Sequence, residues 1–325
     1  MNLSRKETWG VISYDTDKHC FSLVVTGPHR DLPNPTKPVL LNIDLTLRCN
    51  MECRHCVASD MVETVGSLDA GELVLGDRLF NAIEASPFLV VVITGGEPFL
   101  PSQEDRLTKL LRAVKNKGII VDTNGTIVPS EHLLQLLRRQ KVLVRISWDT
   151  PVPREEVKLR CYPKGMYATP LDAIRKKEHV VKALVEAKVP VAIQTVIHKG
   201  NYQAKSLDSF PQKMSALGVT RWVLQRFIPS HRMRMHTIDS KKALRAMEEL
   251  AKKAARAGVS CDYKADLRHN SVYLLVGDRD LYTQSNEEPG KKIPIGKLEE
   301  VDYFAWVSQT DHAYRYLLGS RGRRE

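Results

Sequence analysis

The chain has 325 residues, enough for one large domain or one domain with an appendage, and its composition is that of an ordinary globular protein. The longest strongly apolar run, Phe88 to Ile93, is far too short to span a bilayer, and the first residues lack a signal-peptide core, so we expect a cytoplasmic protein without membrane contact. The formal net charge of +11 fits a solvated basic surface and equally a nucleic acid, nucleotide or acidic peptide as partner.

Short apolar runs separated by turn residues organise the chain from its N-terminus onward. Trp9–Tyr14 and Phe21–Val25 predict a β-hairpin, and the four prolines of Gly27–Pro38 predict an extended linker. After the linker, β-branched apolar runs alternate with amphipathic segments that are typical of helices. The predicted strands are Leu41–Leu45, Leu89–Ile93, Gly118–Val121, Val142–Ile146, Val189–Val196 and Trp222–Phe227. The predicted helices lie near Leu68–Ala85, Glu104–Asn116, Ser130–Arg139, Leu171–Ala187, Lys205–Leu217 and Ser240–Gly258.

Nearly continuous apolar strands separated by helices indicate parallel strands that are buried on both faces. We therefore expect an α/β fold of six repeated units, either a doubly wound sheet or an incomplete barrel, with the chemistry at the C-terminal ends of the strands. Beyond Gly258, Val272–Val276 and Asp280–Thr283 predict a second hairpin, and a last helix is expected over about Val301–Leu318. The predicted domains are residues 1–37 (hairpin and linker), 38–232 (the repeated units) and 233–325 (a small C-terminal α/β cap).

Three of the six cysteines, Cys49, Cys53 and Cys56, follow the first predicted strand of this repeat with the spacing C-x3-C-x2-C. Thiolates are soft ligands that suit iron–sulfur clusters or zinc. Three thiolates on a [4Fe–4S] cube leave one iron open, as catalytic metal sites require. Zinc knuckles more often use two C-x2-C pairs, and no second pair exists, so the iron–sulfur interpretation is favoured. The alternative is a zinc site completed by His55, His19 or Cys20.

The cysteine loop and its place after the first strand resemble the radical S-adenosylmethionine (SAM) superfamily, and the resemblance runs over about Leu41–Phe227. It implies a partial (β/α)6 TIM-like barrel with one [4Fe–4S] cluster on the three cysteines. It also implies that SAM binds the open iron and is reductively cleaved to a 5′-deoxyadenosyl radical, which abstracts hydrogen from a substrate. An external one-electron donor of the flavodoxin or ferredoxin type would supply the electron.

Two strand-end motifs support this resemblance. The second strand ends in Thr94–Pro98, which is similar to the GGEP element that holds the methionyl amino group of SAM in the family. The resemblance therefore assigns Gly95, Gly96 and Glu97 to SAM, whereas an ordinary Gly-Gly turn capped by an acid is the alternative. The third strand ends in a T-N-G sequence that implies Asn124 as a further ligand, although Asn-Gly is also a routine turn.

The remaining cofactor residues lie after the third strand and rest on the resemblance alone. Ser147 stands in the family's S-x-D position and would reach the ribose or carboxylate of SAM, and Arg160 would pair with that carboxylate. Gln194 in the fifth strand would bind the ribose, unless it belongs to a polar network in the core. Leu224 in the sixth strand would flank the adenine through its backbone. No catalytic acid or base is assigned.

The C-terminal region resembles the cap of the SPASM and twitch subgroups, in which several cysteines bind auxiliary clusters. Between His236 and the chain end only Cys261 is present, so we expect a cap without clusters. Cys20, Cys161 and Cys261 are expected to be buried thiols. Relatives with this cap favour a peptide or a small natural-product precursor as substrate.

Two alternatives for the function stay open. One is a viperin-like or other nucleotide-modifying radical SAM enzyme, although viperins usually carry an aromatic residue after the third cysteine, where Val57 stands here. The other is a non-catalytic zinc- or nucleic-acid-binding protein, which would leave the GGEP element without a role.

Overall fold

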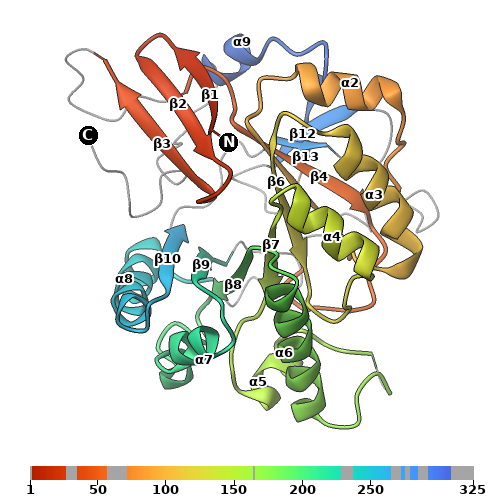
Figure 1. Cartoon of the computed structure of the whole chain (residues 1–325). Coiled ribbons are helices and arrows are strands. Elements are labelled where there is room, and N and C mark those ends of the chain that lie inside the picture. The colour runs from red at the N-terminus through yellow and green to blue at the C-terminus, as the bar shows by residue number, and fades with distance from the viewer. Residues whose placement is uncertain are drawn as a thin grey trace.

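The computed structural model describes residues 2–26, 35–56, 72–163, 165–227, 237–264, 272–274, 279–284 and 292–308. These residues form a three-stranded antiparallel sheet and a ten-stranded sheet, and Figure 1 shows helices arranged around the larger one. Among the helices in these ranges, none combines the length and apolar character that a membrane crossing needs.

Seven consecutive strands of the larger sheet run parallel, in the order β10-β9-β8-β7-β6-β5-β4. This arrangement confirms the α/β fold and the partial TIM-like barrel, which is not closed. The six predicted strands are all present, and β10 is a seventh that the sequence analysis missed because Ser-Cys-Asp-Tyr-Lys is not a β-branched apolar run. The strands are β4 (Leu40–Thr46), β5 (Val90–Gly95), β6 (Gly118–Thr123), β7 (Leu143–Ser147), β8 (Val191–Ile197), β9 (Arg221–Arg226) and β10 (Ser260–Lys264).

The helices between these strands cover the outer face of the sheet. Their apolar stripes join the outward residues of the strands, such as Val91, Val121 and Val144, in one large buried core. They are α2 (Asp77–Ala85), α3 (Glu104–Ala113), α4 (Glu131–Arg139), α5 (Pro153–Leu159), α6 (Pro170–Glu186), α7 (Phe210–Ala216) and α8 (Ser240–Arg256).

Three helix predictions differ from the structure. The segment predicted as one helix over Lys205–Leu217 is a 3-10 turn, η3 (Lys205–Leu207), followed by α7, because Pro211 lacks a backbone N–H and stands in the first turn of the second helix. Helix α5 was not predicted, since its seven residues are too few for a periodic pattern. Of the helix predicted over Leu68–Ala85, residues 68–71 lie outside the described part of the chain, residues 72–76 are not helical, and only Asp77–Ala85 form α2.

The N-terminal sheet closes the end of the barrel at which the strands begin. The predicted hairpin is present as β2 (Gly10–Asp15) and β3 (Cys20–Val25), and β1 (Asn2–Glu7) adds a third, unpredicted strand that pairs with β2. Trp9, Ile12 and Tyr14 pack with residues near the N-terminal ends of the barrel strands. Those barrel residues are Val90, Val92, Ile120, Leu143, Ala192 and Val223.

The C-terminal segments continue the large sheet beyond β4. The two strands of the predicted second hairpin are present as β11 (Val272–Leu274) and β12 (Asp280–Gln284), while residues 275–278 lie outside the described ranges. Strand β11 pairs in parallel with β4. An unpredicted strand, β13 (Lys292–Lys297), pairs with β12, and α9 (Tyr303–Ser308) follows. The last helix was predicted to extend to Leu318, but residues beyond Ser308 lie outside the described ranges. Because β10 and β11 join the barrel sheet at its two sides, the boundary predicted at residue 232 stays a prediction.

His19 makes the closure of the barrel sensitive to acid. Its buried ring Nδ1 lies 3.2 Å from the Tyr14 hydroxyl, and Arg221 donates to its backbone oxygen. Burial, reinforced by Arg221, lowers the pKa of His19 to about 4. The unfolded chain therefore takes up a proton at higher pH than the folded chain, so stability is lost as the pH falls from about 6.5 towards about 4.

We predict that His19→Asn reduces this acid sensitivity, because asparagine tolerates the positive φ of 49° at this position and does not titrate. Between pH 7.5 and 5.5 the wild type should lose on the order of 1 kcal/mol more of its unfolding free energy than the variant loses. Urea unfolding at the two pH values measures the difference. Equal losses in the two proteins would contradict the prediction.

Candidate functional site

The cysteine loop leaves β4 at the end of the barrel opposite to the N-terminal sheet. Cys49 is exposed, and Cys53 and Cys56 are partly buried. Within the described ranges, no three His, Cys, Asp or Glu side chains lie close enough to share one metal ion. A cubane cluster uses a different arrangement, because each thiolate binds its own iron. The three thiols therefore suit a cluster by their number and their shared loop.

Both sides of the cysteine loop are held by neighbouring elements. On one side, Glu52 N donates to Cys161 O (3.0 Å) and Arg54 N donates to Leu159 O (3.2 Å), at the C-terminal end of α5. On the other side, the Asn124 side chain, just after β6, lies 3.8 Å from Cys49 Sγ. The loop is thus clamped between β6 and α5, which fixes the place where a cluster would bind.

Loss of hydration around the sulfur atoms raises the pKa of the Cys49 thiol to about 11 and that of the Cys53 thiol to about 12, although the Cys49 residue as a whole is exposed. Without a metal, both side chains are therefore neutral thiols near pH 7. Cluster binding replaces such protons with iron, as for every thiolate ligand. The residues present fit a [4Fe–4S] cluster in number, donor type and position.

The two glycines of the GGEP element let the ends of β4 and β5 approach each other closely. A β-carbon on Gly95, whose φ is +114°, would lie 2.3 Å from Thr46 O, and one on Gly96 would lie 1.9 Å from Arg48 O. Two backbone hydrogen bonds join the closely spaced segments, since Gly96 N donates to Thr46 O and Glu97 N donates to Arg48 O. These glycines therefore do more than make a turn, because they fix the chain immediately before Cys49.

Glu97 is fully buried and holds the ends of β5 and β6 together. Its carboxylate accepts hydrogen bonds from Phe99 N (2.9 Å), Thr123 Oγ1 (2.7 Å) and Asn124 N (2.7 Å). Burial raises the pKa of Glu97 to about 7. A carboxylate has about four acceptor positions, so about one remains for a ligand ammonium. The predicted contact of Glu97 with the amino group of SAM stays a prediction.

Asn124 belongs to a small polar network beside the cysteine loop. Its Nδ2 donates to Asn50 Oδ1 (2.8 Å), and its Oδ1 accepts from Thr126 N (2.9 Å) and Thr126 Oγ1 (2.6 Å). Asn50 Nδ2 donates to Thr126 Oγ1 in turn (2.9 Å). The amide of Asn124 is therefore used in placing the loop, whether or not it also contacts SAM.

The upper part of the barrel interior is lined by polar side chains. In β6, β7, β8 and β9, the inner-face residues towards the C-terminal ends of the strands are only partly buried, whereas most of their outward neighbours are buried. Ser147 and Gln194 face each other in register on this inner face. The partly buried inner residues include Thr94, Asp122, Arg145, Ser147, Gln194 and Gln225.

Leu224 is placed differently from Ser147 and Gln194. Its side chain is fully buried in the outer core, and its register partners are Thr195 on one side and Tyr263 on the other. Its predicted contact with adenine therefore concerns only backbone groups that lie between two paired strands.

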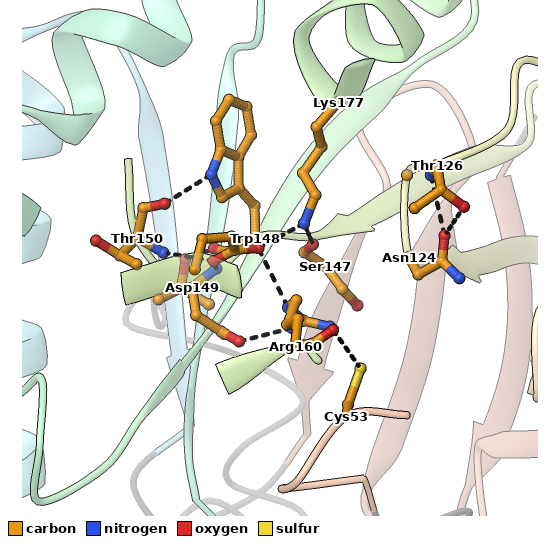
Figure 2. A network of polar contacts seen from close by, with 12 residues as sticks. Cys53, Asn124, Thr126, Ser147, Trp148, Asp149, Thr150, Arg160 and Lys177 are labelled. Atoms are coloured by element: carbon orange, nitrogen blue, oxygen red, sulfur yellow. Dashed lines mark hydrogen bonds and ion pairs between the residues drawn. The ribbon is translucent and has the colours of Figure 1, made fainter. Parts of the chain in front are cut away.

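Arg160 is occupied by carboxylates of the protein. Its Nη2 lies 2.9 Å from Asp149 Oδ2 (Figure 2). Its Nε lies 3.4 Å from Glu156 Oε1, and all three side chains are buried. His55 Nε2 lies 3.3 Å from the same Asp149 oxygen. Burial alone would raise the pKa of Asp149, but Arg160 and His55 hold it well below its usual range. Arg160 thus lies beside the cysteine loop with its guanidinium paired inside the protein, and its predicted pairing with the carboxylate of SAM stays a prediction.

Sequence reasoning missed several residues of this site. Asp122 and Arg145 form a two-bonded ion pair (2.6 and 2.7 Å) on the inner face, which the period-2 alternation of their strands could have indicated. Lys177 is fully buried and contacts Glu156, and its place in the stripe of Ile174 and Val181 on α6 was the available signal.

The other cysteines and the zinc alternative are also placed by the fold. His19 and Cys20 lie in the N-terminal sheet, at the far end of the barrel from Cys49, so neither can complete a site on the loop. The prediction of buried thiols is right for Cys261 and wrong for Cys20 and Cys161, which are only partly buried. Cys20 begins a strand with one partner, and Cys161 lies just after α5.

We predict that Gly96→Ala disturbs the cysteine loop, because the added methyl group overlaps the Arg48 carbonyl. The variant should lose about 1–3 kcal/mol of unfolding free energy and most of the iron that the wild type binds on anaerobic reconstitution. Gly76→Ala is the matched control, since nothing lies within 4 Å of its β-carbon position. Wild-type iron content in Gly96→Ala would contradict this account of the glycine.

Comparison with known proteins adds independent evidence. The family model for the radical SAM superfamily matches residues 43–203. The chain is 34% identical over 117 residues to the subtilosin biosynthesis protein AlbA of Bacillus subtilis and 32% identical over 117 residues to a mitochondrial GTP 3′,8-cyclase of Arabidopsis thaliana. Each match covers 35% of this chain, and 25% and 29% of the two relatives. The chain spans about half or less of the length of the curated relatives that it matches.

The fold is shared with a solved structure. Streptococcus suis SuiB bound to its precursor peptide SuiA superimposes with a TM-score of 0.63 at 12% identity, over 99% of this chain and 90% of that one. The matched family uses a [4Fe–4S] cluster and SAM, so the cofactor prediction is confirmed for the family, while the individual SAM ligands stay predictions. The protein with this cysteine loop and partial barrel belongs to the radical SAM superfamily.

Proposed function

We propose that this protein is a radical SAM enzyme that modifies a peptide by hydrogen abstraction. The observation that carries the proposal is the meeting of the cysteine loop, the GGEP element and the T-N-G sequence at one end of the barrel. Glu97 and Asn124 connect these three segments by direct hydrogen bonds and the contact to Cys49. The N-terminal sheet fills the other end, so in this proposal the substrate would approach from the side of the loop.

When bound, the cluster supplies the electron that cleaves SAM into methionine and a 5′-deoxyadenosyl radical. The protein's own residues place the reactants. Cys49, Cys53 and Cys56 would hold the cluster, with an iron left open for SAM. Gly95 and Gly96 bring the β5 backbone against the start of the loop. The electron would come from an external flavodoxin- or ferredoxin-like donor.

The charges on the inner face support a peptide over a nucleotide. On this face, Arg145 is paired with Asp122. Arg221 lies at the opposite end of the barrel, beside His19, and is paired with Asp262, with Arg221 Nη2 2.6 Å from the carboxylate. The neighbouring polar groups are hydroxyls and amides. A surface with paired charges suits the neutral amide groups of a peptide, whereas a nucleoside triphosphate needs unpaired cations. The net charge of +11 is therefore not concentrated on the described part of this face.

Two comparisons agree with this choice of substrate. AlbA acts in the biosynthesis of a bacteriocin, and SuiB binds a precursor peptide. The match to a GTP cyclase keeps nucleotide modification as the alternative. A small natural product would fit the same inner face of the barrel. Thermal unfolding measured with added nucleotides separates a nucleotide substrate from a peptide or a small natural product.

We expect anaerobically reconstituted protein to hold about four irons per chain and to form 5′-deoxyadenosine from SAM and dithionite. Cys53→Ala should abolish this product without unfolding the barrel, because the side chain lies on a loop. Cys20→Ala, at the other end of the barrel, is the matched control and should keep the activity. Protein that binds zinc and is inert towards SAM would overturn the proposal.

The peptide assignment predicts that nucleoside triphosphates do not stabilise the SAM-bound protein. Thermal unfolding should be measured with SAM, with and without GTP or ATP in millimolar excess. A ligand at one hundred times its dissociation constant adds about 2.7 kcal/mol, which would shift the midpoint by several degrees. A shift of this size that requires SAM would favour the nucleotide alternative.

A further inference from the structure

The end of helix α5 carries three consecutive carbonyl groups that all accept from the cysteine loop. Leu159 O accepts from Arg54 N, Arg160 O from the Cys53 thiol at 3.8 Å, and Cys161 O from Glu52 N. Three neighbouring residues of the loop are thus aligned on three neighbouring residues of the helix end. The position of the Cys53 segment depends on the position of α5.

Helix α5 has only seven residues and would not be stable by itself. The buried Glu156 side chain attaches it to the end of β7. One carboxylate oxygen, Oε2, accepts from Asp149 N (3.0 Å) and Thr150 N (3.1 Å). Only Trp148 separates these two residues from the end of β7 at Ser147. The other oxygen, Oε1, faces Arg160 and Lys177. Glu156 therefore fixes the helix relative to the barrel rim.

Lys177 links the same carboxylate to a second element. Its Nζ donates to Glu156 Oε1 (2.5 Å) and to Ser147 O (2.8 Å), the last residue of β7 (Figure 2). The side chain comes from α6 and is fully buried, over the ring of Trp148 at 6.0 Å from its centroid. Strand β7, helix α5 and helix α6 thus meet at one buried ion pair.

We propose that Lys177 and Glu156 are positioning residues that hold the Cys53 segment of the cysteine loop in its place by fixing helix α5. This inference rests on the proposed role of the loop as the cluster-binding segment. A buried ion pair commonly contributes little net stability compared with apolar residues of the same size, because its charges lose their hydration. Its value here lies in the single geometry that it imposes on α5, and so on the loop.

The contacts to the loop differ in what cluster binding does to them. The thiol of Cys53 gives up its hydrogen when it becomes an iron ligand, so its contact with Arg160 O belongs to the protein without a cluster. The two backbone bonds from Glu52 and Arg54 involve no titratable group and can persist in both states. Hydrogen exchange at the backbone N–H groups of Glu52 and Arg54 is therefore the property to measure.

Lys177→Met tests the proposal, with Lys213→Met as the matched control. Lys213 also lies over the Trp148 ring, at 5.3 Å, but its ion pair, with Glu178 at 2.5 Å, is with a residue of α6 and not of α5. Both variants and the wild type are prepared without a cluster, and their midpoints of thermal unfolding are recorded. Hydrogen exchange of the segment with Glu52 and Arg54, and alkylation of each loop cysteine followed by mass spectrometry, are then compared.

In Lys177→Met we expect the rate of hydrogen exchange of the segment with Glu52 and Arg54, and the rate of Cys53 alkylation, to rise about tenfold or more. The reason is that local opening of this segment would cost less free energy in the variant. Cys49 should react at its wild-type rate, because its neighbour Asn124 belongs to the other side of the clamp. Lys213→Met should leave both rates unchanged. Wild-type rates in a folded Lys177→Met protein, or equal increases in the control, would overturn the proposal.

Glu156→Gln is the second variant, in case Lys177→Met does not fold. It keeps the size of the side chain, but its NH2 group must face either the two backbone donors or Lys177. The same rise in exchange and in Cys53 alkylation is expected, and its absence in folded protein would count against the proposal. Since all readouts are taken without a cluster, absence of SAM cleavage would refute the proposed function and leave this test unaffected.

Discussion

The site depends on the parallel course of the seven barrel strands. Parallel strands place all their C-terminal ends at one rim, so segments that are far apart in the chain meet there. The cysteine loop after β4, the glycines after β5 and Asn124 after β6 are neighbours for this reason. The close contact of Gly96 with the Arg48 backbone then sets the height of the loop relative to the rim.

The two ends of the barrel interior have opposite character. Trp9, Ile12 and Tyr14 fill the lower end with an apolar core, and the buried His19 is kept neutral there. The upper end is lined by hydroxyls, amides and paired charges on the inner face of the strands. This division places the polar side chains of the interior at the same end of the barrel as the cysteine loop.

Buried charges support the rim from outside the barrel. Asp149, Glu156, Arg160 and Lys177 are all buried, and two acids balance two bases. Such a group is costly to desolvate unless each member is paired, and each of the four has an ionic partner within 3.4 Å. The arrangement links β7, α5 and α6 and connects them to the Cys53 segment. The packing of these helices therefore also determines where the cysteine loop would hold a cluster.

The sequence by itself determined the α/β repeat, the six strands and the cysteine loop, because β-branched runs and thiol spacing are local properties of the chain. The family resemblance added Gly95, Gly96 and Glu97 as expected SAM ligands, and their place at the end of β5 puts them at the rim. The sequence analysis missed β1, β10 and β13, whose residues become strands only by pairing with β2, β9 and β12. Only the tertiary structure decided that Arg160 is paired with Asp149 and that Lys177 contacts Glu156 of α5. It also decided that His19 and Cys20 lie far from the loop. Those outcomes depend on which distant segments pack together, and neither spacing nor periodicity carries that information.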